Sequence, residues 1–315
     1  MTSYAVELMP PAITGYREGN TGIDYMTTFD SGKPGPHVMV NAVTHGNELC
    51  GAIVVDFLFR EGVRPTRGKL TLGFANYRAM LSFDARYPGL SRYVDEDFNR
   101  LWSPEVLDGD RDSDELRRAR EIRPLIDTVD LLLDLHSMQT NAPALMLAGP
   151  LEKGRLLAAA VGVPEYVVSD EGHAAGKRMR DYADFGNPDS PKNALLVECG
   201  QHWEKASANV AMQTTLRFLK HCDVVDHGFL DAHITPNPAP QKFITVTEAV
   251  TIEDPDFEFV DDYNGMEVIP KAGTVIAHDG PKPVKTPYDD CALIMPSRRT
   301  AAGQTAVRLG RFTHR

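Results

Sequence analysis

Residues 37–48 read HVMVNAVTHGNE, an apolar run that ends in a polar cluster containing His45 and Glu48. The apolar and β-branched residues predict a strand, and apolar residues at helical spacing over 47–61 predict a helix directly after it. Residues three apart at a helix start face the same way, so both side chains can reach one ion. Gly46 permits a tight turn between the two elements. The stretch predicts half of a metal site, although two surface residues would show the same spacing.

A second histidine follows another strand-like run. Residues 129–135 are almost continuously apolar, as in a strand buried on both faces, and His136 comes at the carboxyl end. Ligands in open α/β sheets gather at this edge, so His136 is expected near His45 and Glu48. Two imidazoles and one carboxylate suit a catalytic zinc ion, which keeps a further position for water. Asp134 shares a strand face with His136 and can fix the tautomer of such a ligand. The alternatives are a core histidine and a strand-end cap.

Residues 194–200, ALLVECG, predict a further strand with Glu198 near its end. A zinc hydrolase needs a general base that takes a proton from water and later gives it to the leaving nitrogen. Burial against apolar neighbours raises the pKa of a carboxyl group toward the range that such a base needs. Glu198 is therefore the candidate base, and a structural strand-end carboxylate is the alternative.

Residues 76–104 show no sustained period and contain Arg78, Asn99 and Arg100. A long irregular loop in a compact domain is usually functional or disordered. Arginine binds carboxylates through two parallel N–H groups, and beside a scissile carbonyl it can stabilise a developing oxyanion. Together with Trp102, this cluster is typical of substrate recognition, whereas isolated arginines usually lie on the surface.

Strand-like and helix-like runs alternate up to about residue 222, which predicts α/β layers around a largely parallel or mixed sheet. A proline-rich linker at 234–241 follows, and beyond it short alternating runs separated by turn signals predict a small all-β domain. We therefore expect a catalytic α/β domain over residues 1–232 and a β domain over residues 233–315.

The net charge of −11 and the pI near 5.4 argue against a nucleic-acid or anionic-membrane partner, since either would need a basic face. The N-terminal residues lack the features of a signal peptide, and no segment reaches the ~18 apolar residues of a membrane span. A cytoplasmic location is expected. The four cysteines are widely separated in the sequence, which disfavours disulfides. The number of subunits stays open, with a homo-oligomer as one option.

Four motifs, HGNE at 45–48, DFNR at 97–100, DLHS at 134–137 and VECG at 197–200, occur in the order seen in the succinylglutamate desuccinylase/aspartoacylase family. The sequence resembles this family, a relative of the zinc carboxypeptidases, over about residues 35–225. The resemblance implies a three-layer α/β/α, zinc-carboxypeptidase-like catalytic domain followed by a smaller C-terminal β domain.

The resemblance also implies roles for individual residues. One Zn²⁺ ion per subunit would be bound by His45, Glu48 and His136, and Glu198 would be the general base and acid. Arg78 matches the arginine that polarises the scissile carbonyl in this family. Asn99 and Arg100 match the residues that hold the amino-acid carboxylate of the substrate in this family.

The match departs from the family pattern at Cys199 and Trp102, neither of which touches the proposed chemistry. Arg178, Arg180 and Tyr182 are candidates for contacting an acidic acyl group, but a solvated helix face is the favoured interpretation of that segment.

Three functions follow as hypotheses. The leading one is a zinc amidohydrolase that cleaves a small N-acylated substrate, such as an N-acyl amino acid. The second is a zinc carboxypeptidase acting on peptides, and the third is a catalytically silent metabolite-binding relative with the same fold.

Overall fold

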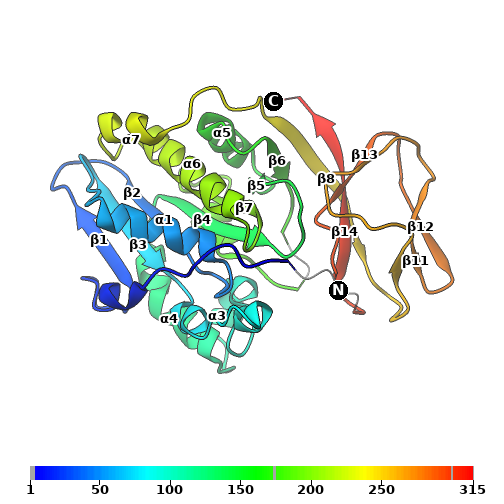
Figure 1. Cartoon of the computed structure of the whole chain (residues 1–315), viewed down its shortest axis with the longest axis horizontal. Coiled ribbons are helices and arrows are strands. Elements are labelled where there is room, and N and C mark those ends of the chain that lie inside the picture. The colour runs from blue at the N-terminus through cyan, green and yellow to red at the C-terminus, as the bar shows by residue number, and fades with distance from the viewer. Residues whose placement is uncertain (1–3, 173–174, 299–300, 315) are drawn as a thin grey trace.

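The computed structural model describes residues 4–172, 175–298 and 301–314. Within them, one mixed sheet of eleven strands runs through the whole molecule (Figure 1). Its strands, in spatial order, are β1 (Met26–Asp30), β3 (Lys69–Phe74), β2 (His37–Ala42), β4 (Leu131–Met138), β7 (Asn193–Gln201), β5 (Leu145–Leu147), β6 (Tyr166–Ser169), β8 (Lys242–Thr251), β14 (Thr305–Thr313), β13 (Cys291–Ile294) and β10 (Val268–Ile269).

The centre of this sheet is parallel. Strand β2 pairs with β3 on one side and β4 on the other, and β4 pairs with β7. Their carboxyl ends therefore meet at one edge, as the sequence predicts. The register aligns Ala42 with Leu135 and His136 with Glu198. Beside these strands, β1 and β5 depart from the parallel pattern, since they run antiparallel to β3 and β7.

Helices cover both faces of the parallel region (Figure 1). The α-helices are α1 (Leu49–Arg60), α2 (Tyr77–Leu81), α3 (Pro104–Leu107), α4 (Asp114–Ile126), α5 (Glu152–Val161), α6 (Lys205–Cys222) and α7 (His227–His233). Short 3₁₀ turns are η1 (Ile13–Tyr16), η2 (Pro88–Ser91), η3 (Phe98–Arg100), η4 (Met179–Asp181) and η5 (Ala183–Gly186). Among the described residues, no helix combines the length and apolarity needed to cross a membrane.

Alternate side chains of the central strands enter two different cores. Val38 and Val40 of β2 pack in the core that contains α1, α5 and α6, whereas Met39 packs in the core that contains α3 and α4. Strand β4 divides in the same way, with Leu133 on the first side and Leu132 on the second. Burial on both faces explains the near-continuous apolar sequence of these strands. The predicted three-layer α/β/α arrangement is confirmed.

The C-terminal region is rich in β-structure, as predicted, but its main strands extend the sheet of the α/β region. Strand β8 pairs in parallel with β6, and β14, β13 and β10 follow it antiparallel. A separate sheet of three strands packs nearby, formed by β12 (Lys282–Lys285), β11 (Val275–Asp279) and β9 (Glu258–Phe259). The sheet thus passes across the predicted boundary at residue 232 without a break, so the domain division stays a prediction.

Candidate metal centre

The strand-to-turn segment after β2 positions two of the predicted ligands. Helix α1 begins at Leu49, so His45 and Glu48 lie in the turn before it rather than within its first turn. Val43 adopts a left-handed backbone with φ of 62°, which bends the chain out of the strand at this point. Such conformations are costly for β-branched residues and are found mostly at functional sites.

Gly46 serves this turn through its small size. A Cβ atom there would lie 2.3 Å from the backbone carbon of Ala79 and 2.4 Å from the backbone oxygen of Ser91. Its own N–H donates to the carbonyl oxygen of Arg92 at 3.0 Å. The glycine therefore allows the His45 turn to pack directly against the irregular loop, and no left-handed φ is involved.

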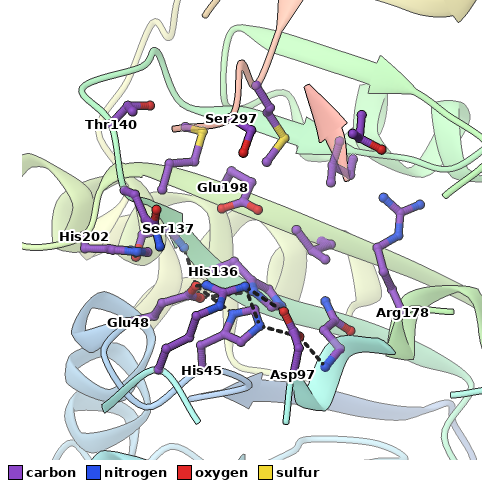
Figure 2. A pocket seen from close by; sticks show the side chains of 18 of the residues that line it. His45, Glu48, Asp97, His136, Ser137, Thr140, Arg178, Glu198, His202 and Ser297 are labelled. Atoms are coloured by element: carbon purple, nitrogen blue, oxygen red, sulfur yellow. Dashed lines mark hydrogen bonds and ion pairs between the residues drawn. The ribbon is translucent and has the colours of Figure 1, made fainter. Parts of the chain in front are cut away.

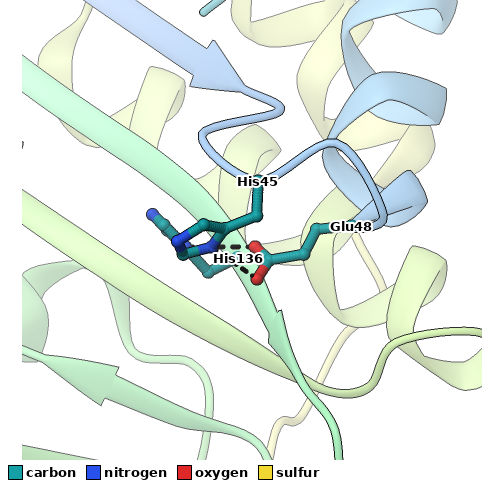
Figure 3. A group of neighbouring side chains, drawn as sticks. All are labelled: His45, Glu48 and His136. Carbon is teal, nitrogen blue, oxygen red and sulfur yellow. Dashed lines mark hydrogen bonds and ion pairs between the residues drawn. The ribbon is translucent and has the colours of Figure 1, made fainter. Parts of the chain in front are cut away.

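The three predicted ligands converge, as Figure 3 shows. One potential ligand atom each from His45, Glu48 and His136 lie within 4.8 Å of one another. The two Glu48 oxygens approach the Nδ1 atoms of His45 and His136 at 2.8 and 3.0 Å. All three side chains are buried. Burial opposes ionisation of Glu48, but the two imidazoles hold its pKa well below the ordinary value. The group could hold a metal ion, and its donor set of two nitrogens and a carboxylate fits one.

Each imidazole has a carboxylate at its far nitrogen. Nε2 of His136 lies 2.7 Å from Asp134 Oδ2, in the arrangement expected from the sequence. Nε2 of His45 lies 2.9 Å from Oδ1 of Asp97, the first residue of the DFNR motif. Asp134 is itself fixed by donors from the Asn41 amide and the Thr44 hydroxyl, both at 2.8 Å. Carboxylates placed in this way orient ligand imidazoles and fix their tautomers.

Glu198 stands above this group, across from His136 in the β4–β7 register (Figure 2). It is buried and lines a pocket of about 230 Å³ together with all three candidate ligands. Its Oε2 atom has no hydrogen-bond partner among the described residues. Burial raises the pKa of Glu198 to about 8, a range suited to proton transfer near neutral pH.

The irregular loop brings Arg92 to the pocket, a residue that the sequence analysis does not single out. Its guanidinium donates to Asp97 Oδ2 at 3.0 Å and lies 3.6 Å from Glu48 Oε1. The loop is held by the buried carboxylate of Glu115 on α4, which accepts backbone N–H groups at 2.6 Å, 2.9 Å and 3.2 Å from three consecutive residues starting at Val94. The buried Glu115 carboxylate therefore fixes the part of the loop that follows Arg92.

Arg78 is not brought to the pocket. It lies on α2 with its side chain 47% exposed, and it donates to Asp114 Oδ1 at 3.2 Å. Asn99 and Arg100 do line the pocket. The Asn99 amide oxygen accepts from the backbone N–H of Met179, so it also positions the segment opposite. Arg92 rather than Arg78 thus places a guanidinium beside the ligand group.

The segment around residue 178 is buried, and the solvated helix face favoured from its sequence is wrong. Arg178 lines the pocket and forms two parallel hydrogen bonds to Asp170, at 2.9 and 2.8 Å. Arg180 is buried below it and donates to two backbone carbonyls. Arg308 of β14 also lines the pocket, with its Nε 3.7 Å from Asp170. The counter-charge of Asp170 and Asp181 allows several guanidinium groups to be buried here.

Trp102 and Tyr182 are core residues rather than pocket residues. Trp102 is fully buried and packs edge-on against Phe98 and Tyr182. The indole therefore supports the DFNR turn from behind, which agrees with the expectation that Trp102 does not touch the proposed chemistry.

Two further residues complete one end of the pocket. His202 follows β7, and its Nδ1 lies 2.8 Å from the hydroxyl of Ser137, the last residue of the DLHS motif. Both line the pocket and are buried. Burial lowers the pKa of His202 to about 3, so the ring is uncharged at neutral pH. A signal existed in the sequence, since His202 lies only four residues after the candidate base.

Parts of the sequence match a known protein family and several of its curated members. Residues 34–222 match the family model described as the succinylglutamate desuccinylase/aspartoacylase catalytic domain. The chain is 30% identical to mouse aspartoacylase over 125 residues, which are 37% of this chain and 38% of the relative. It is 28% identical to the rat N-acyl-aromatic-L-amino acid amidohydrolase (carboxylate-forming) over 127 residues, 38% of each chain. The matched stretch thus spans about two fifths of these curated relatives.

Solved structures extend the similarity in fold over most of the chain. Succinylglutamate desuccinylase from Vibrio cholerae has a TM-score of 0.67 at 17% identity, covering 92% of this chain and 86% of that one. The ectoine utilization protein EutE (DoeB) from Ruegeria pomeroyi has a TM-score of 0.63 at 18% identity, covering 90% and 88%. The family model itself covers well over half of the chain. The chain therefore belongs to the succinylglutamate desuccinylase/aspartoacylase family.

Proposed function

We propose that this protein is a zinc-dependent amidohydrolase that hydrolyses the amide bond of an N-acyl amino acid or a related small N-acyl amine. The observation that carries the proposal is the position of Glu198, whose unpartnered carboxylate oxygen lies in one pocket with the three candidate ligands. The names of the curated relatives, an aspartoacylase and an N-acyl amino acid amidohydrolase, support the same reaction class.

His45, Glu48 and His136 would hold the zinc ion. Their donor set matches that of catalytic zinc sites, and Asp97 and Asp134 accept from the far imidazole nitrogens, as is usual for zinc-bound histidines. When bound, zinc supplies Lewis acidity, which activates water and polarises a carbonyl group.

Glu198 would carry the proton in both directions. Its free Oε2 accepts a proton from the attacking water and then delivers it to the leaving nitrogen, so the amine departs in neutral form. Arg92 presents a guanidinium fixed by Asp97, and it would stabilise the negative charge that develops on the scissile carbonyl oxygen. These two residues divide the proton transfer and the charge stabilisation between them.

The arginines at one end of the pocket favour an anionic substrate. Arg100, Arg178 and Arg308 all line it. The fork of Arg178 is held by Asp170, so Arg100 and Arg308 are the arginines that would meet a substrate carboxylate. Asn99 and Arg100 would bind the carboxylate of the amino-acid part. The charge at this end supports a small acidic amide as substrate, and no nucleic acid or membrane is proposed as a partner.

The size of the pocket favours small amides over peptides. Its volume is about 230 Å³, and residues of the C-terminal region, including Met295 and Arg308, form part of its wall. A carboxypeptidase would need room for the residues that precede the scissile bond. The C-terminal β-structure therefore restricts entry in the way expected of a deacylase.

A substrate panel tests the proposal. Zinc-loaded protein is incubated with N-acyl amino acids that vary in both parts, and with peptides of the same C-terminal residues. We expect release of the free amino acid from acidic N-acyl amino acids and no release from the peptides. Release from peptides without deacylation would overturn the proposal in favour of a carboxypeptidase.

A further inference from the structure

His202 is a buried polar group of the pocket that the proposed reaction does not use. His202 is 1% exposed and lines the pocket, yet its Nε2 atom has no hydrogen-bond partner among the described residues. Buried polar atoms are nearly always paired, and an unpaired one destabilises the folded protein. An unpaired nitrogen beside a substrate pocket therefore points to a partner that arrives with the substrate.

The hydrogen-bond partner of the other ring nitrogen assigns the tautomer. Ser137 Oγ lies 2.8 Å from His202 Nδ1, and this is the hydroxyl's sole partner within the described part of the chain. A serine hydroxyl hydrogen needs an acceptor, and Nδ1 is the one within reach. If the hydroxyl donates to Nδ1, the neutral ring carries its hydrogen on Nε2. The free atom is then a donor.

The position of His202 tells which part of the substrate it meets. Figure 2 shows His202 and Ser137 on one side of Glu198 and Arg178 on the other. The scissile carbonyl would lie between Glu198 and the metal ligands. With the amino-acid carboxylate bound at the arginine end, the acyl chain extends toward His202.

We propose that His202 is a specificity residue whose Nε2–H donates a hydrogen bond to an oxygen atom on the acyl chain of the substrate. The preferred acyl groups then carry a hydroxyl or carboxylate oxygen beyond the scissile carbonyl, and plain hydrocarbon chains leave the donor unpaired. Ser137 acts as a positioning residue, because its hydroxyl holds the ring in the required tautomer. This inference rests on the proposed amidohydrolase function.

A comparison of matched acyl groups on one amino acid tests this role. The pairs are 3-hydroxybutyryl against butyryl, and succinyl against the isosteric 4-methylpentanoyl. For wild-type protein we expect kcat/KM to favour the oxygen-bearing member of at least one pair by about 10- to 100-fold, the order expected when the other member leaves a buried donor unpaired.

Variants separate hydrogen bonding from packing. His202→Phe keeps a ring without a donor, and the preference should fall to about 1. His202→Gln keeps an N–H near the Nε2 position and should restore part of it. Ser137→Ala should weaken the preference, and His221→Phe, on the exposed end of α6, serves as a control that keeps it. Equal losses on both members of each pair would overturn the inference.

Binding of the free acids gives a readout independent of turnover. Calorimetric titration of zinc-loaded wild type and His202→Phe with 3-hydroxybutyrate, butyrate, succinate and 4-methylpentanoate should show a preference for an oxygen-bearing acid that the variant loses. Failure of wild type to hydrolyse any N-acyl amino acid would refute the proposed function. The titration would still show whether His202 selects oxygen-bearing acids. Equal affinity of wild type within both pairs would refute the role of His202 alone.

Discussion

Glu198 combines two properties that a general base needs, a free oxygen toward the ligand group and a pKa raised by burial to about 8. Replacing it with glutamine keeps the size of the side chain and removes its proton affinity. We expect Glu198→Gln to lower kcat/KM by about 10²- to 10⁴-fold, the usual contribution of a general base. Zinc content, measured by mass spectrometry of the metal, should stay that of wild type.

The matched control for this variant is Glu204→Gln, at the start of α6 and outside the pocket. It should retain wild-type activity. Wild-type turnover in Glu198→Gln would show that another group carries the proton.

Substitution of the two arginines of the irregular loop is expected to have opposite effects on activity. Arg92 lies beside Glu48 and Asp97 in the pocket, whereas Arg78 pairs with Asp114 on an exposed face. Loss of a donor to a developing oxyanion typically costs about 10²- to 10³-fold in kcat. We expect Arg92→Lys to lose activity of this order, because lysine lacks the fixed fork, and Arg78→Lys to lose less than about twofold. A larger loss in Arg78→Lys would restore the role first predicted for it.

These residues show what local sequence can and cannot tell. His45, Glu48 and His136 are predictable because they lie near or just after the carboxyl ends of apolar strands, and parallel strands bring such ends together. Arg92 follows no strand and has no motif around it. Its position depends on Gly46 and Glu115, which hold the loop through contacts far away in sequence. Nothing in the local pattern records those contacts.

At the scale of elements, the turn between β2 and α1 depends on the absence of one atom. A Cβ at position 46 would meet backbone atoms of Ala79 and Ser91 at 2.3–2.4 Å, and backbone cannot rotate away as a side chain can. We expect Gly46→Ala to displace His45 and to lower zinc affinity by at least tenfold in a competition titration with a chelator. Gly15→Ala is the control, since a Cβ there meets nothing within 4 Å. Unchanged zinc affinity in Gly46→Ala would mean that the backbone at Ala79 and Ser91 moves to accommodate the methyl group without displacing His45.

The start of β2 carries a pH-sensitive contact outside the pocket. The buried ring of His37 lies 2.7 Å from the Thr71 hydroxyl and 3.1 Å from the carbonyl oxygen of Thr128. Burial lowers its pKa below the ordinary value of 6.5. The unfolded chain therefore binds a proton more readily, and stability is full above pH 6.5 and falls as the pH drops from there toward the folded-state pKa.

Urea unfolding of wild type and His37→Gln between pH 7.5 and pH 5 measures this contribution. We expect the free energy of unfolding to fall more steeply in wild type, by up to about 1.4 kcal/mol per pH unit for one proton. His221→Gln, on an exposed part of α6, should keep the wild-type slope. Identical slopes in His37→Gln and wild type would contradict the assignment.

Elements with a strong apolar pattern are the ones that the sequence predicts well. Strand β7 includes all of the predicted residues 194–200, and β4 includes all but the first two residues of the predicted run 129–135. Strand β1 is absent from the prediction because it is a half-exposed edge strand, where the apolar signal is weak. The antiparallel direction of β5 is likewise invisible, since the sequence of a three-residue strand does not record its direction.

At the scale of the whole molecule, one sheet connects the ligand-bearing strands to the C-terminal region. The linker at 234–241 and the change of composition after it predict a separate domain, but β8 pairs with β6 and continues the sheet. The change in composition indicates that helices end at this point, but it carries no information on which strands pair. The continuation of the sheet through β8 could therefore not be predicted. Its consequence is functional, because β14 carries Arg308 into the pocket wall.

The proposed function requires that amide hydrolysis depend on a metal ion held by His45, Glu48 and His136. The most direct measurement is hydrolysis of the best N-acyl amino acid by one sample before chelation, after chelation and after addition of one equivalent of Zn²⁺, beside His136→Ala treated in the same way. We expect one bound zinc per chain, loss of activity on chelation and recovery with zinc in wild type, and neither zinc binding nor recovery in the variant. Full activity in the metal-free protein, or recovery in His136→Ala, would contradict it.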